Sequence, residues 1–259
     1  MNWDEIVKRV IPVVVKIETP SGHGTGFLCL YNETRTFCGI ATAYHVVKHA
    51  EQWQEPIRIT HYPSGTNAFL RESDRIIFPD PDRDSAVLLI GTGQLKFPDT
   101  PIQLLPTDHR LPIGMDVGWL GYPSIAAATL CFFSGNVSAW QDSRSAYLID
   151  GVAINGVSGG PVLYSTSADG AQIVGAISAY RANRATGEAL PGLSIAQDVS
   201  HFHDIITQIG TWDEANRQKK ALAQQKATEP ESPSSPPAPV PEPATPVPAA
   251  TPTTEQSRT

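Results

Sequence analysis

One short stretch of the chain carries a residue that could do covalent chemistry. Ser158 lies in Asn155-Gly156-Val157-Ser158-Gly159-Gly160-Pro161, among three glycines. Glycines at this density let the backbone take positive φ values and approach a bound molecule closely. A serine in such a loop can present its hydroxyl to a substrate while neighbouring amides bind an oxyanion. The same residues also suit a tight turn between strands, so other parts of the chain must decide.

A histidine and an aspartate precede this serine in positions that could activate it. His45 ends an apolar segment where the chain turns into a short helix. Asp84 stands directly before an uncharged strand, although Asp82 in the same turn is an alternative. A serine hydroxyl is a weak nucleophile and needs an imidazole base, which in turn needs an anion to orient it. The order His45, Asp84, Ser158 supplies each group once.

The residues around Ser158 also match the motif of one class of hydrolase. Gly156-x-Ser158-x-Gly160 fits the nucleophile elbow of α/β-hydrolases, in which Asp198 and either His201 or His203 would complete the triad. That elbow requires a helix after the serine, whereas residues 161–164 have the composition of a strand. The pattern therefore favours the order with histidine and aspartate first.

No metal or cofactor is expected. The pairs His45 with His49 and His201 with His203 lack the glutamate or further ligands that zinc chemistry needs. The glycine-rich residues 22–26 precede a strand rather than a helix, which excludes a dinucleotide loop.

The composition limits the partners and the location. The 259 residues carry a net charge of −7, with a pI near 5.5, so the basic surface that nucleic acids require is not expected. No run approaches the roughly 18 apolar residues that span a bilayer, and residues 1–16 lack a signal-peptide pattern. We therefore expect no membrane insertion and a cytoplasmic protein. Three cysteines favour reduced thiols, although Cys29 and Cys38 flank a hairpin turn and could pair.

The segments that must position these residues are mostly strands. About eleven short runs rich in β-branched or aromatic residues lie between residues 13 and 196, separated by turn residues. Helical pattern is scarce before residue 198, apart from a turn or two at 45–52, which excludes alternating βαβ units. An antiparallel sandwich or barrel arrangement remains, with residues 105–114 bridging two β units.

The C-terminal part changes character twice. Residues 201–226 have helical composition, with Gly210 as an expected break. From residue 229 to residue 259, ten of 31 residues are proline and apolar periodicity is lost, which predicts a disordered or polyproline-II tail. Its PxxP matches leave a tail-binding partner open, but a plain solvated tail is favoured.

Four motifs occur in a characteristic order over residues 10–200. They are Ser21-Gly22-His23-Gly24-Thr25-Gly26-Phe27, Thr42-Ala43-Tyr44-His45-Val46, Asp84-Ser85-Ala86-Val87-Leu88 and Gly156-Val157-Ser158-Gly159-Gly160-Pro161. In this order they resemble the trypsin-like (chymotrypsin-fold) serine peptidases, most closely the HtrA-like bacterial branch but without a PDZ domain. The resemblance implies two antiparallel six-stranded β-barrels and a C-terminal helix.

The expected domain organisation follows from this resemblance. Residues 1–108 would form the first barrel half with a leading helix, and residues 109–200 the second. Residues 201–228 would form the C-terminal helix, and residues 229–259 the proline-rich tail.

The resemblance assigns a role to each catalytic candidate. Ser158 would be the nucleophile, His45 the general base and then the acid, and Asp84 the residue that orients His45. The backbone N–H groups of Gly156 and Ser158 would form the oxyanion hole. The protein would then be a serine endopeptidase acting on protein or peptide bonds.

The resemblance also places the substrate. An extended peptide would pair with the strand that contains Ser178, Ala179 and Tyr180, with the Ser178 hydroxyl near Asp84. Val152 would lie at the base of the pocket that receives the residue before the scissile bond. Because no carboxylate stands there, we expect cleavage after small or medium apolar residues.

One departure from the family bears on activation. Secreted members activate when a newly cut N-terminus pairs with an aspartate directly before the nucleophile, and Val157 occupies that place here. The loop from 150 to 157 must therefore be ordered in another way, either preformed or set by a partner or substrate. The alternative function is a protease-fold binding or sensor protein with slow or conditional catalysis, but the complete His45, Asp84 and Ser158 set favours a peptidase.

Overall fold

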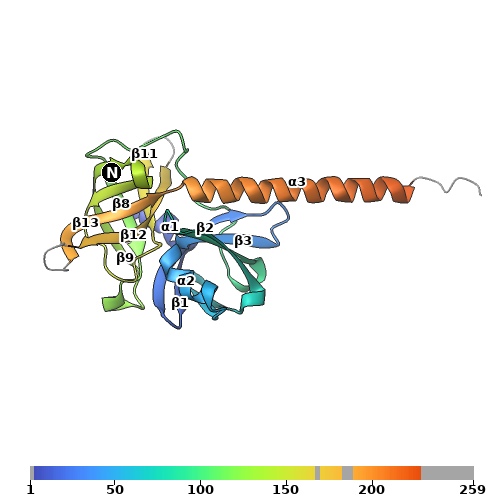
Figure 1. Cartoon of the computed structure of the whole chain (residues 1–259), viewed down its shortest axis with the longest axis horizontal. Helices are drawn as coiled ribbons and strands as arrows, with labels where there is room; N and C mark the ends of the chain where they lie inside the picture. Colours follow the sequence, from blue (N-terminus) through green and yellow to red (C-terminus); the bar gives the residue numbers. More distant parts are fainter. Residues whose placement is uncertain (1–2, 167–169, 183–188, 229–259) are drawn as a thin grey trace, which may run out of the picture. The chain divides into compact units, whose positions relative to one another are not determined.

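The computed structural model describes residues 3–166, 170–182 and 189–228. Residues 1–217 form one compact unit and residues 218–259 a second. The first unit consists mainly of two β halves that pack side by side (Figure 1). The predicted all-β, chymotrypsin-like class is confirmed. The predicted tail, residues 229–259, lies outside the described residues.

The N-terminal half is a seven-stranded antiparallel sheet in the order β5-β4-β1-β2-β3-β7-β6. Its strands are β1 (Val14–Thr19), β2 (Gly22–Tyr31), β3 (Phe37–Ala43), β4 (Ile57–His61), β5 (Thr66–Leu70), β6 (Arg75–Asp80) and β7 (Ser85–Gly91). Helix α1 (Trp3–Val10) precedes β1, and helix α2 (Tyr44–Gln52) follows β3. The turns that end β3 and begin β7 therefore carry His45 and Asp84 side by side.

This half has seven strands where the sequence predicted a six-stranded barrel. The strands β5 and β6 were not predicted from the sequence, and the side chains of β6 show the reason. Arg75 is buried because its guanidinium donates to the backbone carbonyls of Leu70, Ala50 and Glu55, whereas Ile76 is 51% exposed. A strand with a buried cation and an exposed isoleucine lacks the polar-out, apolar-in alternation on which strand prediction depends.

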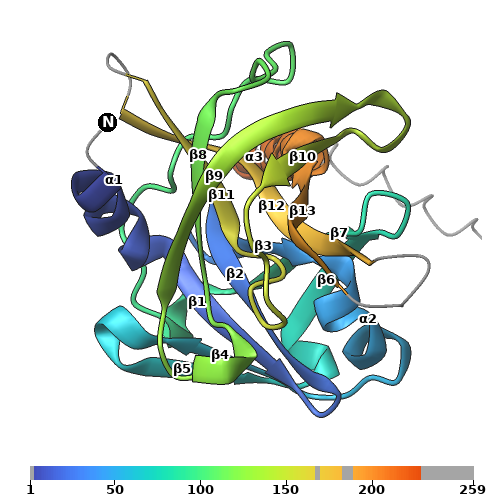
Figure 2. The same ribbon diagram turned by 90° about the vertical axis from the view of Figure 1, so that its left-hand side faces the viewer.

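The C-terminal half is the closed six-stranded barrel that was predicted (Figure 2). Its strands are β8 (Asp116–Gly121), β9 (Cys131–Gln141), β10 (Ala146–Asp150), β11 (Pro161–Thr166), β12 (Gly170–Ala182) and β13 (Ala189–Asp198), in the order β10-β13-β12-β11-β8-β9. The segment that contains Ser158 joins β10 to β11, at the side of the barrel that faces β2.

The C-terminal helix α3 runs from Ser200 to Thr228 without a break. The expected break at Gly210 was wrong. A glycine inside a helix costs about 1 kcal/mol relative to alanine, which neighbouring turns can offset. Phe202, Ile205 and Ile209 are buried in the turns just before it, and the Phe202 ring packs edge-on against Phe27 of β2.

Two further features bear on the sequence-based expectations. No helix in the described part of the chain is both long and apolar enough to cross a membrane. Cys29 and Cys38 are buried free thiols, and burial raises the pKa of both. The thiolate form that oxidation requires is therefore disfavoured at both positions.

Candidate active site

The loop between β10 and β11 needs glycine at two positions beside Ser158. Gly156 has φ +91 and Gly159 has φ +82, both in the left-handed region. A Cβ atom at Gly156 would lie 2.3 Å from the carbonyl oxygen of Tyr122, and one at Gly159 would lie 2.1 Å from that of Thr25. The loop therefore passes too close to two other segments for any side chain at these points.

Some backbone amides of this loop donate hydrogen bonds within the protein, and others do not. Three of the five amides from 156 to 160 donate to backbone carbonyls. They pair Val157 with Ile154 (3.0 Å), Gly159 with Ile177 (2.6 Å) and Gly160 with Val157 (2.9 Å). The other two amides, those of Gly156 and Ser158, donate to no residue that the structure describes. The free donors are thus the two that were predicted for an oxyanion hole.

Two hydrogen bonds join His45 to Asp84. Asp84 Oδ1 accepts from the His45 amide at 2.9 Å, and Asp84 Oδ2 lies 2.8 Å from the ring nitrogen Nδ1. An ionised carboxylate can only accept hydrogen bonds, so Nδ1 carries the proton of the neutral ring and Nε2 is left as an acceptor. This is the tautomer that a general base needs.

The same carboxylate caps helix α2. Ala43 precedes the helix and has no side chain that could accept from its first amides. Asp84 reaches across from the start of β7 and takes the His45 amide, and its own carbonyl accepts from the Tyr44 amide at 3.0 Å. A negative charge at this position also suits the positive end of the helix dipole.

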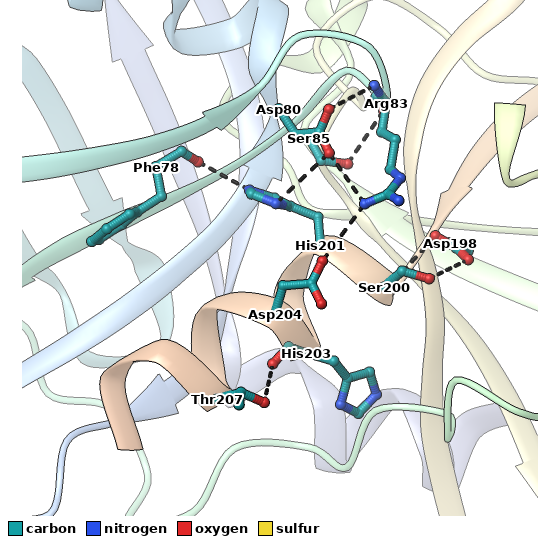
Figure 3. Close-up of polar contacts among 10 residues, drawn as sticks. All are labelled: Phe78, Asp80, Arg83, Ser85, Asp198, Ser200, His201, His203, Asp204 and Thr207. Carbon is teal, nitrogen blue, oxygen red and sulfur yellow. Dashed lines mark hydrogen bonds and ion pairs between the residues drawn. The ribbon is translucent and has the colours of Figure 1, made fainter. Parts of the chain in front are cut away.

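The turn that carries Asp84 is held by its own side chains and by the first turn of α3 (Figure 3). Asp80 accepts from the amide and the guanidinium of Arg83, at 3.0 and 3.3 Å. Arg83 also lies 3.7 Å from the carboxylate of Asp204, and the buried His201 ring lies 3.9 Å from Asp80. Asp84 itself has φ +49, a conformation that aspartate adopts more readily than most residues, and these contacts fix it there.

The surroundings of Asp84 favour its charged form. Burial by itself would raise the pKa of this carboxyl, but the hydrogen bond and charge of His45 and the Ser178 hydroxyl outweigh burial and lower the pKa below its ordinary value of 3.8. The Ser178 hydroxyl donates to Asp84 Oδ2 at 2.5 Å. Asp84 is therefore an anion at neutral pH, as a residue that stabilises a charged imidazole must be.

This lowered pKa predicts a pH-dependent stability. Because the folded state holds the proton less tightly than the unfolded chain, the stabilisation is complete above pH 3.8 and is lost as the pH falls through the folded-state pKa. We expect the free energy of unfolding, measured in urea between about pH 5 and pH 2, to decrease as the pH is lowered. Asp84→Asn should flatten part of that fall, and an unchanged slope would contradict the assignment.

A cavity of about 290 Å³ brings the predicted catalytic side chains together. It is lined by His45, Asp84, Ala153, Ile154, Asn155, Ser158, Ile177 and Ser178. The Ser158 hydroxyl points toward the carbonyl oxygen of Ser178 at 3.5 Å, and no hydrogen bond joins it to His45 among the described residues. Catalytic hydrogen bonds are often long in unliganded sites and tighten when substrate binds.

Comparison with known families identifies the domain. A family model described as a trypsin-like peptidase domain matches residues 24–175, more than half of the chain. The chain belongs to the trypsin-like peptidase family. This membership supports serine peptidase activity.

Solved structures agree with this peptidase in fold. The Deg5 structure is 23% identical, with a TM-score of 0.57 over 78% of this chain and 90% of its own. The inactive form of a serine-to-alanine mutant of Rv3671c from M. tuberculosis H37Rv is 18% identical, with a TM-score of 0.54 over 80% of this chain and 90% of its own. Comparison with curated protein sequences gave no match.

The predicted substrate-binding residues of this peptidase are only partly brought to the cavity. Ser178 lines it, whereas Val152 is 51% exposed and does not. Ala153 and Ile154, one and two residues further along, do line it. The role of Val152 in the substrate pocket therefore stays a prediction, and the conformation of the loop places its two neighbours at the cavity wall.

The strand beside the cavity has one free edge. Pairing of β12 with β11 ends at Ala176, while pairing with β13 continues through Ala179 and Tyr180. Beyond Ile177 the edge of β12 that faces the Ser158 loop is thus open in the described residues. The side chains of Ala179 and Tyr180 lie outside the part of the chain that the structure describes.

The α/β-hydrolase alternative finds no support in this geometry. A strand, β11, follows Ser158 where that fold requires a helix. His201 and His203 contact the backbone carbonyls of Phe78 and Leu105, and Asp198 accepts from Ser200. None of these groups lines the Ser158 cavity. The described residues also contain no cluster of three or more side chains suited to a metal.

Proposed function

We propose that this protein is a serine endopeptidase that cleaves peptide bonds through Ser158, His45 and Asp84. The observation that carries the proposal is the 2.8 Å contact between Asp84 and Nδ1 of His45, at the wall of a cavity that Ser158 also lines. This contact leaves Nε2 of His45 unprotonated and able to accept the proton of the Ser158 hydroxyl. Family membership supports the same reaction class.

The reaction proceeds in two steps, acylation of Ser158 and hydrolysis of the acyl ester. Ser158 Oγ attacks the carbonyl carbon of the scissile bond while its proton passes to Nε2 of His45, and Asp84 stabilises the imidazolium. His45 then gives the proton to the leaving amine, which departs and leaves an acyl ester on Ser158. Water attacks this ester by the same route, with His45 again as base and then acid, and releases the carboxylic acid.

The negative charge that develops on the carbonyl oxygen requires donors that are already in place. The amides of Gly156 and Ser158 have no partner among the described residues, so they can bind this oxygen without breaking an existing hydrogen bond. An extended substrate can add to the open edge of β12 beyond Ile177, which would hold its backbone beside Ser158.

The cavity wall predicts the preferred substrate. Ala153, Ile154 and Ile177 contribute apolar surface, and Asp84, which is bound to His45, is the one carboxylate among the lining residues. We expect peptides with alanine, valine or leucine before the scissile bond to exceed those with arginine or lysine in kcat/KM by at least about tenfold. A panel of fluorogenic peptides that differ at this position measures the ratio, and a preference for basic residues would contradict it.

The direct test is covalent labelling with a fluorophosphonate probe. The probe should modify the wild-type chain at Ser158, should not modify Ser158→Ala, and should react far more slowly with His45→Ala. Folded wild-type protein that fails to react, with and without added peptide, would instead favour a protease-fold binding or sensor protein. Mass spectrometry of the labelled peptide identifies the modified serine.

A further inference from the structure

Thr25 of β2 is a buried residue whose hydroxyl ties the Ser158 loop to the end of β8. Its side chain is fully buried. The hydroxyl donates to the carbonyl oxygen of Gly156 at 2.8 Å and accepts from the amide of Tyr122 at 3.0 Å. One side chain of the N-terminal half therefore joins two segments of the C-terminal barrel that are 34 residues apart (122 and 156).

The backbone on either side of Gly156 is fastened as well. The Thr25 amide donates to the Ser158 carbonyl at 2.8 Å, and the Ser124 amide donates to the Asn155 carbonyl at 2.7 Å. In a trans peptide the C=O and N–H bonds point in opposite directions. Holding the Asn155 carbonyl on Ser124 thus turns the amide of Gly156 away from that contact, toward the side where it meets no described donor or acceptor.

The residue directly before the nucleophile, Val157, has no charge that could order the loop. Val157 is fully buried, and its side chain packs against Gly121, where a Cβ would lie 2.7 Å from Val157 Cγ1. An apolar residue in this place excludes the ion pair that orders the loop of secreted family members. Hydrogen bonds from another segment must hold the carbonyls instead.

We infer that Thr25 is a positioning residue for the oxyanion hole. Its hydroxyl and its amide hold the carbonyls of Gly156 and Ser158, and these fix the peptides next to those that carry the free amides of Gly156 and Ser158. The inference rests on the proposed peptidase function. Thr25 does not touch the substrate and acts through the loop. The hydrogen bonds of Thr25 also explain how the Ser158 loop can be ordered in this chain without a newly cut N-terminus.

Two substitutions separate the hydroxyl from the bulk of the side chain. Thr25→Val keeps the branched shape, which suits a strand, and removes the hydroxyl. The Gly156 carbonyl and the Tyr122 amide then both lose a buried partner. Thr25→Ser keeps the hydroxyl and removes a methyl group. If Thr25 only fills space, valine is the better replacement; if it positions the loop, serine is.

The experiment compares the full-length wild-type, Thr25→Val and Thr25→Ser chains. It measures kcat and KM for one peptide, inhibition by a peptide boronic acid of the same sequence, and Tm. The boronic acid forms a tetrahedral adduct with the serine, so its affinity reports the oxyanion hole. We expect Thr25→Val to lower kcat by about 10- to 100-fold, below the 10² to 10³ that follows outright loss of an oxyanion donor. Affinity for the boronic acid should fall by a similar factor, with KM nearly unchanged and recovery in Thr25→Ser.

The opposite outcomes overturn the inference. The inference is wrong if Thr25→Val keeps the wild-type kcat and the wild-type affinity for the boronic acid. It is also wrong if Thr25→Ser loses as much kcat as Thr25→Val. Hydrogen exchange at the Tyr122 amide separates this failure from failure of the proposed function. Unchanged exchange in Thr25→Val overturns the inference, whether or not the wild-type chain reacts with fluorophosphonate. If the Tyr122 amide exchanges faster in Thr25→Val but the wild-type chain does not react with fluorophosphonate, the contact exists but has no catalytic role. That result would overturn both the inference and the proposed function.

Discussion

Replacing Ser158 with alanine is expected to lower kcat for a peptide substrate by about 10⁶-fold, the size found when the serine of such a triad is removed. The change deletes one oxygen atom from a cavity wall and leaves the fastened backbone of the loop in place. KM should therefore change little, and Tm should stay near the wild-type value. Progress curves of a fluorogenic peptide at high protein concentration measure the residual rate.

The triad also predicts that losses do not add. Once Ser158 is gone, His45 has no nucleophile to activate, so the double variant Ser158→Ala, His45→Ala should be no slower than either single variant. Ser134→Ala, at an exposed position of β9, serves as a control and should keep wild-type kcat. If Ser158→Ala retained more than about 1% of wild-type turnover, another nucleophile would have to be sought.

The candidate catalytic residues could be selected from the sequence because each of them has a local signature. Glycines surround Ser158, an apolar strand ends at His45, and Asp84 opens an uncharged strand. His45 and Asp84 lie next to the ends of β3 and β7, and Ser158 lies in the loop before β11. The structure brings all three side chains to one cavity.

What the sequence could not supply depends on contacts between distant residues. The hydrogen bond from Thr25 to Gly156 spans 131 positions, and nothing in either local pattern indicates it. The inward turn of Ala153 and Ile154, in place of Val152, depends on φ and ψ values in an irregular loop. Burial of Arg75 by backbone carbonyls likewise hid β6, because its partners come from other segments.

Asp84 has two tasks in this structure, and one substitution can separate them. Its carboxylate accepts from the His45 amide, which caps α2, and from Nδ1 of the ring, which sets the tautomer. Asparagine offers one acceptor and one donor. If its oxygen keeps the cap, its amide nitrogen donates to Nδ1 and forces the proton onto Nε2, which can then no longer accept from Ser158.

We therefore expect Asp84→Asn to lower kcat by about 10⁴-fold, as the equivalent change does in a trypsin-family enzyme. The free energy of unfolding at pH 7 should fall only by the part that the charge of Asp84 contributes, because the cap of α2 is kept. Asp84→Ala should lose turnover to a similar degree and also lose the cap of α2, which is worth about 0.5–2 kcal/mol. Urea unfolding and peptide hydrolysis of the same preparations measure both quantities.

The exposed neighbour Asp82 supplies the matched control, because it is the carboxylate that the sequence left as an alternative. Asp82→Asn removes a charge from the same turn without touching His45, so kcat and stability should both stay near wild type. A large loss of turnover in Asp82→Asn, or wild-type turnover in Asp84→Asn, would contradict the assignment of Asp84. Equal stability of Asp84→Asn and Asp84→Ala would show instead that the hydrogen bond to the His45 amide does not stabilise α2.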